Sequence, residues 1–429
     1  MLEAFLKNFG FETSDIDRIT NFYKGRYIED KALYKNALVI IRWFTSYGFS
    51  DIDVIKTTMQ MPSILMCSLD KIIDTMEYLK SLDYTKDEVV KLVTISPSVL
   101  KSDICDLKEK RIYLASKGYR NTEINKMSLY HAGIYNLSID NLESKRQCLG
   151  AIGFTDKEIN KITVKSPVYS YKNDSIMEKM EYLLTLNYSR NEIMEMLKKL
   201  PSLFGLSKEI IGEKRNILKA LNFSDDEINK VTKKLPAFYS YSLENITGKF
   251  SFLESLGYEM EDIKTMILRN PEIFCLSISN IESKIKYFLI FGYEISVIKT
   301  IFKEAPSLLG RKVESFEEKI NLLKAYDYTD TEIIHITAAL PTIFCYSPSL
   351  LREKIDFYKA LGLERMIIDK PTNLMQSTKL TFARCRLLED RGFVLEDNNY
   401  SALFISSQKF EHKHGIGKKE LLKKYPYKQ

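Results

Sequence analysis

The sequence predicts an all-α protein built as a helical-repeat solenoid, and three observations support that prediction. Prolines recur at steps of about 35 residues along most of the chain. Between them, amphipathic stretches of helical period alternate with turn residues, and no stretch shows the alternation typical of a strand. A period kept over some three hundred residues indicates stacked supersecondary units. The prolines are Pro62, Pro97, Pro167, Pro201, Pro236, Pro271, Pro306, Pro341 and Pro371, with Ala132 in the place of a missing one.

Each unit is expected to begin with a short turn and a capped helix. Two apolar residues follow each proline closely and predict a single 3-10 turn. The side chain six residues after the proline can accept hydrogen bonds from free amides, so it is expected to be the N-cap of a first helix. These residues are Ser68, Asp103, Ser138, Asn173, Ser207, Ser242, Ser277, Ser347 and Ser377, with Lys312 as the exception. Apolar residues ten, fourteen and seventeen positions after the proline then form one helical face.

A column of Gly, Asn and Asp is expected to end the first helix in the left-handed conformation. These residue types tolerate a positive φ, which the position after a helix often requires. The column consists of Asp83, Gly118, Gly153, Asn187, Asn222, Gly257, Gly292, Asp327, Gly362 and Gly392. An aromatic residue follows in most units, and then a capping box opens a second helix. The boxes are Thr85/Glu88, Thr155/Glu158, Ser189/Glu192, Ser224/Glu227 and Thr329/Glu332.

One continuous solenoid with four parts is the expected domain organisation. Residues 1–61 form a divergent N-terminal repeat or cap, in which Gly10-Phe11 followed by Ser14 resembles a worn copy of the unit. Residues 62–340 form eight regular repeats, and residues 371–429 form a C-terminal repeat with a basic tail. Residues 341–370 are too few for a full unit, so a truncated second helix is expected there.

Composition excludes several classes of protein. No apolar run approaches the roughly 18 residues that span a bilayer, so no membrane segment is expected. The six cysteines form no CxxC pair, which favours buried free thiols in a reducing compartment over disulfides or zinc. The net charge of +6 arises mostly from the C-terminal end, because the body is nearly balanced. A basic end of this kind is compatible with a nucleic-acid partner.

The first thirty residues mix acidic and basic side chains, whereas organelle transit peptides are rich in Arg and poor in acids. We therefore expect a bacterial cytoplasmic protein. The alternative is a mitochondrial or plastid protein from which a presequence has been removed.

The candidate site is a column of basic residues about thirteen positions after each proline. One such residue per repeat would draw a line of positive charge along the solenoid and contact phosphates without reading sequence. The alternative is structural: a Lys stem at the edge of the apolar stripe covers core surface, and its ammonium caps carbonyls of a neighbouring turn. The column is Lys110, Lys145, Lys179, Lys214, Lys249, Lys284, Lys319, Lys354 and Arg384, and Arg111, Arg146, Arg215 and Arg386 would widen it.

No catalytic centre, metal site or cofactor is expected. The glutamates of the capping boxes recur once per unit, so capping explains them better than catalysis. His412 and His414 have no neighbouring Cys or Asp that would complete a metal site. The aromatic residues after the left-handed turns could stack on bases, but their fixed link to a helix end favours core packing.

The order of these motifs resembles the mitochondrial transcription termination factor (mTERF) family. The order is proline, apolar pair, serine cap, Leu-Gly-aromatic as at Leu256–Tyr258, and Thr-x-x-Glu-Ile as at Thr155–Ile159. The closing segment Ser406–Phe410 is similar to that family as well. The resemblance implies a left-handed superhelix of three-helix units whose concave basic groove holds nucleic acid. It also implies a role in organelle transcription termination, gene expression or ribosome assembly.

We therefore expect a non-enzymatic nucleic-acid-binding protein that follows the backbone along a basic groove. Duplex DNA is the favoured partner and RNA the alternative, with roles in transcription termination or regulation or in RNA- and ribosome-related gene expression. A monomer is expected. The second hypothesis is a protein-interaction scaffold whose groove holds a partner. Lysines that face the groove favour nucleic acid, whereas lysines that lie over the seams between units favour the scaffold.

Overall fold

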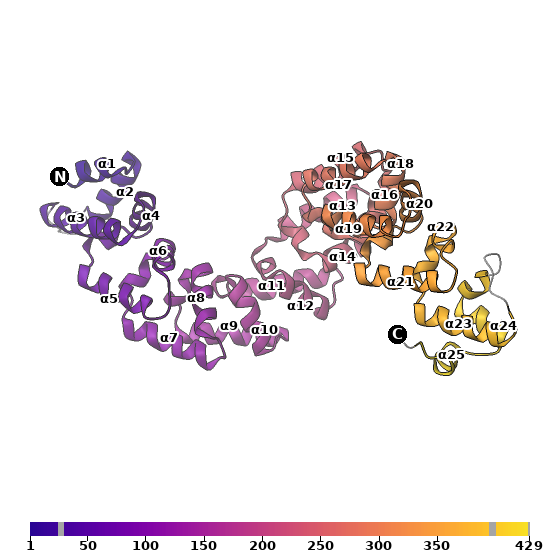
Figure 1. Cartoon of the computed structure of the whole chain (residues 1–429). Helices are drawn as coiled ribbons and strands as arrows, with labels where there is room; N and C mark the ends of the chain where they lie inside the picture. The colour runs from indigo at the N-terminus through magenta and orange to yellow at the C-terminus, as the bar shows by residue number, and fades with distance from the viewer. Residues whose placement is uncertain (25–29, 394–399, 428–429) are drawn as a thin grey trace. The chain divides into compact units, whose positions relative to one another are not determined.

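The computed structural model describes residues 1–24, 30–393 and 400–427, and every regular element in these ranges is helical. The fold is thus an all-α helical-repeat solenoid, as the sequence predicts (Figure 1). Contacts divide the chain into two compact units. The first unit is Met1–Asn216 with Thr232–Ser240, and the second is Ile217–Val231 with Tyr241–Gln429.

Each repeat consists of a 3-10 turn, a first helix and a second helix. The turns are η1 Pro62–Met66, η2 Pro97–Lys101, η3 Ala132–Asn136, η4 Val168–Ser170, η5 Pro201–Gly205, η6 Pro236–Ser240, η7 Pro271–Cys275, η8 Pro306–Gly310, η9 Pro341–Cys345 and η10 Pro371–Met375. The first helices are α5 Leu69–Lys80, α7 Ile104–Ser116, α9 Ile139–Ile152, α11 Asn173–Thr185, α13 Lys208–Ala220, α15 Leu243–Ser255, α17 Ile278–Phe291, α19 Val313–Lys324 and α21 Pro348–Ala360. The second helices are α6 Lys86–Ile95, α8 Asn121–Tyr130, α10 Asp156–Lys165, α12 Arg190–Lys199, α14 Asp225–Lys234, α16 Met260–Arg269, α18 Ile295–Glu304 and α20 Asp330–Ala339.

The ends of the chain depart from this regular pattern. The N-terminal helices are α1 Leu2–Phe9, α2 Thr13–Tyr23, α3 Asp30–Tyr47 and α4 Asp51–Gln60. The C-terminal elements are α22 Met366–Asp369, α23 Thr378–Asp390, η11 Tyr400–Phe404, α24 Ser407–His414 and α25 Lys418–Lys424. The second helix α22 is only 4 residues long, whereas α20 has 10.

The predicted left-handed column is confirmed at all of its positions. The four non-glycine members adopt φ values of 65° at Asp83, 64° at Asn187, 63° at Asn222 and 67° at Asp327. The glycines of the column have positive φ as well, for example 108° at Gly292. At Gly292 the turn amide donates to the carbonyl of Leu289, so it satisfies one of the carbonyls left free at the end of α17.

Eight of the nine predicted N-caps directly precede their helices, and one is wrong. The Ser277 hydroxyl accepts from the amide of Asn280 at 3.1 Å, as a helix start requires. Asn173 is instead the first residue of α11, and Lys172 precedes it as N-cap, because this unit is one residue shorter.

The predicted capping boxes are confirmed, and their glutamates also join consecutive repeats. In α10, Glu158 accepts from the amide of Thr155 at 3.0 Å and pairs with Lys198 on α12 at 2.8 Å. These bonds, led by the one from Lys198, lower the pKa of the Glu158 carboxyl to about 2. One carboxylate therefore serves a helix start and a contact between neighbouring second helices.

In the first unit of the chain the core extends from repeat to repeat, because one repeat cannot bury its own apolar face. In the first unit of the chain, one buried cluster runs from Leu2 to Tyr169. The aromatic residues after the left-handed turns belong to the core, as expected. Tyr119 is 4% exposed, and its hydroxyl hydrogen-bonds the Thr163 hydroxyl of the next second helix at 2.7 Å. In Figure 1, α5 and α7 lie on one side of this stack and α6 and α8 on the other.

Two glycine substitutions test the role of the left-handed turn. Gly292→Ala should lower the free energy of unfolding by about 1–2 kcal/mol, because a Cβ is strained at φ 108°. Gly248→Ala should raise it by about 0.5–1 kcal/mol, because Gly248 lies inside α15 with open space around its Cβ position. Urea denaturation of both variants measures the difference. A Gly292→Ala protein as stable as Gly248→Ala would contradict the assignment.

Buried His131 is expected to make stability depend on pH. Burial, with a smaller contribution from Lys145, lowers the pKa of His131 to about 4, below the ordinary value of 6.5. The unfolded chain therefore binds this proton more readily, and stability is lost as the pH falls from about 6.5 to 4, by up to about 3 kcal/mol. His131→Gln should flatten the dependence of Tm on pH in this window. The control His335→Gln changes an exposed residue and should retain the wild-type dependence.

Candidate nucleic-acid interface

The predicted basic column lies in the seams between consecutive repeats. Of its nine members, only Lys110 is not buried, and the others are between 1% and 8% exposed. A side chain of a first helix reaches the 3-10 turn of the next repeat in five of the seams. By the criterion stated above, this position favours a structural role. The prediction that these residues contact phosphates therefore gains no support from where they lie.

The ammonium groups of this column cap the ends of 3-10 turns. Lys145 on α9 donates to the carbonyl of Tyr171 at 2.5 Å, directly after η4. Lys354 on α21 donates to the carbonyl of Gln376 at 2.8 Å, directly after η10. A cation there satisfies a carbonyl left free at a helix end and complements the negative end of the turn. The same bond joins Lys110 to Tyr135, Lys179 to Leu206 and Lys214 to Tyr239.

Two members of the second unit bond within their own helix instead. Lys284 donates to the carbonyl of Asn280 at 2.9 Å, and Lys319 pairs with Glu318 at 2.8 Å. Burial lowers the pKa of several members of the column, because water no longer solvates their ammonium groups. They are Lys145, Lys179, Lys214, Lys249, Lys284 and Lys354.

The three adjoining arginines form buried networks with tyrosines. Arg146 is 4% exposed and donates to the Tyr119 hydroxyl at 3.2 Å and to Asn160 Oδ1 at 2.8 Å. It also pairs with Asp156 and lies within 3.3 Å of the Tyr169 hydroxyl. Arg111 and Arg215 make the corresponding bonds to Tyr135 and Tyr239. A buried guanidinium with these partners is part of the core, so it is not presented to a ligand.

A sequence signal for these networks exists, although the sequence analysis above did not use it. Each repeat with an arginine at this position has an asparagine fourteen residues later and a tyrosine at the following 3-10 turn. Repeats with Met180, Phe250 or Ile285 there have neither residue. The arginine therefore occurs together with the asparagine and the tyrosine, as expected because a buried polar side chain needs a hydrogen-bond partner.

The two C-terminal arginines differ from each other. Arg384 is 1% exposed and donates to the carbonyls of Leu403 at 2.6 Å and Ile405 at 2.7 Å. Arg386 is exposed on the same helix and pairs with Glu389 at 2.8 Å. The basic tail is folded, because α25 packs on α23 and the Tyr425 hydroxyl donates to Asp390 at 2.5 Å. Of the two arginines, only Arg386 can reach a ligand without unfolding this region.

A recurring set of exposed cations without a partner in the described ranges lies on the second helices of the first unit. One lysine per helix occupies the sixth helical position, and it is exposed and makes no ion pair or hydrogen bond among the described residues. We call these four residues the second-helix lysines: Lys56 on α4, Lys91 on α6, Lys126 on α8 and Lys161 on α10. Because α4, α6, α8 and α10 pack successively on one another, the lysines follow each other along the stack. Tyr130, at the end of α8, is 59% exposed beside them.

The first helices of the same unit present acidic side chains. Exposed carboxylates occur on each of α5, α7, α9 and α11. They are Asp70, Asp74, Glu77, Asp106, Glu109, Asp140, Asp174, Glu178 and Glu181. Because Lys145 and Lys179 are buried in the seams, these carboxylates outnumber the exposed lysines of the same helices, which are Lys71, Lys80 and Lys108. A phosphate backbone is therefore repelled from the first helices and attracted to the second-helix lysines.

Other site chemistry is limited within the described ranges. No group of three His, Cys, Asp or Glu side chains there could hold a metal ion. All six cysteines are free thiols, but only Cys385 is buried. Cys105 and Cys275 are exposed, which corrects the expectation of burial, since both lie near helix or turn ends at the surface. No helix among the described residues is long and apolar enough to cross a membrane.

A double-mutant cycle tests the structural role of the arginines. Arg146→Met should cost about 2–4 kcal/mol of stability, because it leaves buried hydroxyl and amide groups without their donor. Adding Tyr169→Phe should cost less than the sum of the single changes, with a coupling of about 1–3 kcal/mol. Urea denaturation of the four proteins measures the coupling. Additive costs would show that the two side chains act independently.

Comparison with protein families agrees with the repeat architecture. The mTERF family model matches three overlapping segments, residues 24–152, 135–255 and 242–411. No curated protein matches the chain. Members of that family are in general non-enzymatic, nucleic-acid-binding helical-repeat proteins, and they are organellar or bacterial. Since the three matches together cover most of its length, the chain belongs to the mTERF family.

Proposed function

We propose that this protein binds the phosphate backbone of a nucleic acid through the second-helix lysines of its first unit. The observation that carries the proposal is the division of charge between the two helical layers. Lys56, Lys91, Lys126 and Lys161 are exposed and unpaired, whereas the neighbouring first helices present carboxylates. The layer of second helices therefore attracts a polyanion more strongly than the layer of first helices does.

The spacing of these lysines suits contact with a backbone. Packed helices lie about 8–10 Å apart, so consecutive repeats place one ammonium at roughly that interval. Phosphates along a strand are more closely spaced, so each lysine can find one without a fixed register. The exposed ring of Tyr130 supplies a surface on which a base or sugar can stack. Lysine contacts of this kind position a nucleic acid but carry little sequence information.

Duplex DNA is the favoured partner, because its two strands offer the highest density of phosphate charge to such a row. RNA is the alternative. The biological role that we propose is transcription termination or regulation, or RNA- and ribosome-related gene expression, exerted by a monomer. We also propose the domain organisation given by the sequence: an N-terminal cap over 1–61, regular repeats over 62–340, a truncated repeat over 341–370 and a C-terminal repeat over 371–429.

Salt-dependent binding tests this function. Fluorescence anisotropy with duplex DNA, single-stranded DNA and structured RNA, from about 50 to 200 mM salt, should show an affinity that falls steeply with salt. The variant Lys91→Gln/Lys126→Gln/Lys161→Gln should reduce the log–log slope by about three, since each phosphate contact contributes about 0.9.

A matched control changes three exposed lysines of the first helices, Lys80→Gln/Lys108→Gln/Lys208→Gln, and should retain the wild-type slope. The buried lysines of the basic column, which we call the seam lysines, give a second comparison. Lys214→Gln should lower Tm, because it removes the bond to the next repeat, and should leave the salt slope unchanged. Absence of binding to all three nucleic acids at low salt would refute the proposal and favour the scaffold hypothesis.

A further inference from the structure

A recurrent pocket for a lysine side chain joins consecutive second helices in the second unit of the chain. Lys264 on α16 lies seven residues before the next proline. Its ammonium donates to the carbonyl of Asn222 at 2.9 Å and pairs with the Glu227 carboxylate at 3.0 Å. The same nitrogen lies 5.6 Å from the ring centroid of Phe223. One turn thus binds one cation through three groups. They are the carbonyl of the left-handed residue Asn222, the ring of Phe223 and the carboxylate of the capping residue Glu227.

The next repeat fills the equivalent pocket in the same way. Lys299 on α18 also lies seven residues before a proline, and its ammonium donates to the carbonyl of Gly257. Its nitrogen lies 5.4 Å from the ring centroid of Tyr258. The Tyr258 hydroxyl in turn donates to the backbone carbonyl of Lys299 at 3.1 Å. The turn therefore binds both the side chain and the backbone of the incoming helical residue.

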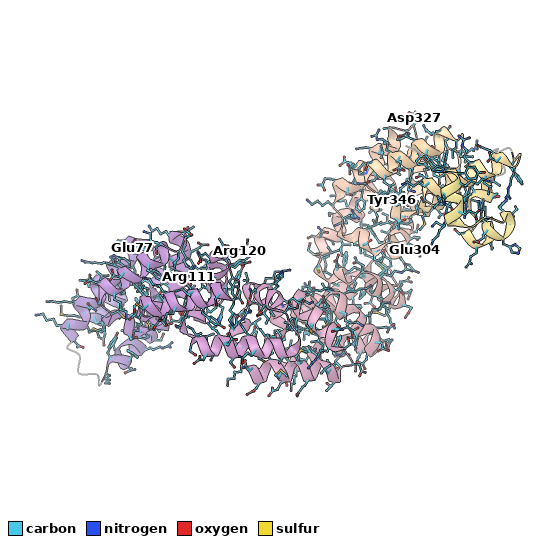
Figure 2. All side chains as sticks on the ribbon, turned by 90° about the horizontal axis from the view of Figure 1, so that it is seen from below. Glu77, Arg111, Arg120, Glu304, Asp327 and Tyr346 are labelled. Atoms are coloured by element: carbon cyan, nitrogen blue, oxygen red, sulfur yellow. The ribbon has the colours of Figure 1, made fainter. Side chains whose placement is uncertain are left out.

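The last full repeat has the same turn, but no lysine stands at the position that corresponds to Lys264 and Lys299. Its left-handed residue is Asp327, labelled in Figure 2, followed by Tyr328 and the capping glutamate Glu332. The next second helix, α22, lacks the turns that carry Lys264 and Lys299 in the longer helices. The residue seven positions before Pro371 is Glu364.

These three residues line a cavity of about 560 Å³, which we call the Tyr328 pocket. Tyr328 is 9% exposed, and its buried hydroxyl has no hydrogen-bond partner in the part of the chain that the structure describes. Glu332 accepts from Thr329 at the helix start but, unlike Glu227, makes no ion pair among the described residues. The Glu227 carboxylate of the Lys264 pocket and the Tyr258 hydroxyl of the Lys299 pocket thus both have counterparts here, and neither counterpart binds a residue of a neighbouring helix among the described residues.

The surrounding charge also favours a cation. Glu364 and Asp369 line the cavity in addition to Asp327 and Glu332, against Lys359 and Arg365. An excess of carboxylates repels phosphate, so the Tyr328 pocket is unsuited to a nucleic acid. The inference below is therefore independent of the proposed function.

We propose that the Tyr328 pocket binds a lysine side chain presented by an α-helix of a partner protein. The ammonium would donate to the Asp327 carbonyl and pair with Glu332, and the Tyr328 hydroxyl would donate to the backbone of the same helix. A helix is the expected carrier because Lys264 and Lys299 both reach their pockets from 10-residue helices. The partner helix replaces the turns that α22 lacks.

A peptide copied from the chain itself tests the pocket. The probe is a fluorescein-labelled peptide with the sequence of residues 258–270, which contains Lys264 as its only lysine. Fluorescence anisotropy with the full chain should show saturable binding. The same peptide with Lys264→Gln should bind at least about tenfold more weakly, because it loses a charge-assisted hydrogen bond. In the protein, Glu332→Gln should weaken binding by a similar factor, since glutamine keeps the capping box.

A variant that fills the pocket from within provides a second readout. Glu364→Lys places an ammonium at the position of Lys264 and Lys299, so it should raise Tm and prevent peptide binding. Glu282→Lys makes the same change of charge at an exposed site on α17 and should do neither.

Each outcome bears on the proposal. Equal binding of the lysine and glutamine peptides would overturn it. The proposal would also be overturned if the peptide did not bind and the Glu364→Lys protein had the same Tm as the Glu282→Lys control. Stabilisation by Glu364→Lys without peptide binding would support an ammonium pocket and overturn a helical occupant. Displacement of the peptide by micromolar spermidine would identify a free polyamine, and not a protein, as the occupant.

Discussion

In five of the seams, consecutive repeats are joined by a hydrogen bond from a lysine of the first helix to a carbonyl at the end of the next 3-10 turn. The proline that opens each turn cannot donate a hydrogen bond, and the turn is too short to satisfy its own last carbonyls. The preceding first helix supplies the missing donor, for example from Lys145 to Tyr171. The long apolar stem of the lysine covers the core beside it. One lysine side chain thus connects neighbouring repeats and covers the apolar surface between them.

This use of lysine divides the basic residues of the protein into two populations. The seam lysines and the buried arginines are committed to the fold, and the cost of desolvating them is offset only by their fixed partners. The second-helix lysines have no such partners and keep their water. Formal net charge does not distinguish the two populations, so a nearly neutral body can still carry a strongly basic layer. Burial and pairing, rather than the count of charges, decide which surface a polyanion meets.

The sequence was sufficient for the architecture because each local device has its own residue type. Glycine, asparagine and aspartate marked every left-handed turn, and Ser/Thr-x-x-Glu marked five of the eight second helices. It was insufficient for the role of the basic column, because Lys214 lies at the edge of the apolar face. A position there is compatible with a seam and with a groove. The deciding group is the carbonyl of Tyr239, which accepts the hydrogen bond from Lys214. Tyr239 belongs to the next repeat, so a helical wheel of one helix does not include it. The second-helix lysines escaped notice because Glu195, Thr265 and Thr300 interrupt their column.

The short helix α22 also has a consequence for how the chain unfolds. In a solenoid, each repeat is stabilised only by contacts with its neighbours. An interface that lacks most of one helix therefore couples the unfolding of the two repeats more weakly. Beyond α22, the helices α23, α24 and α25 share a small core of their own, formed by residues such as Leu387 and Phe410. We therefore expect the C-terminal segment to open as a cooperative unit of its own, so that its amides exchange with solvent while the preceding repeats stay folded.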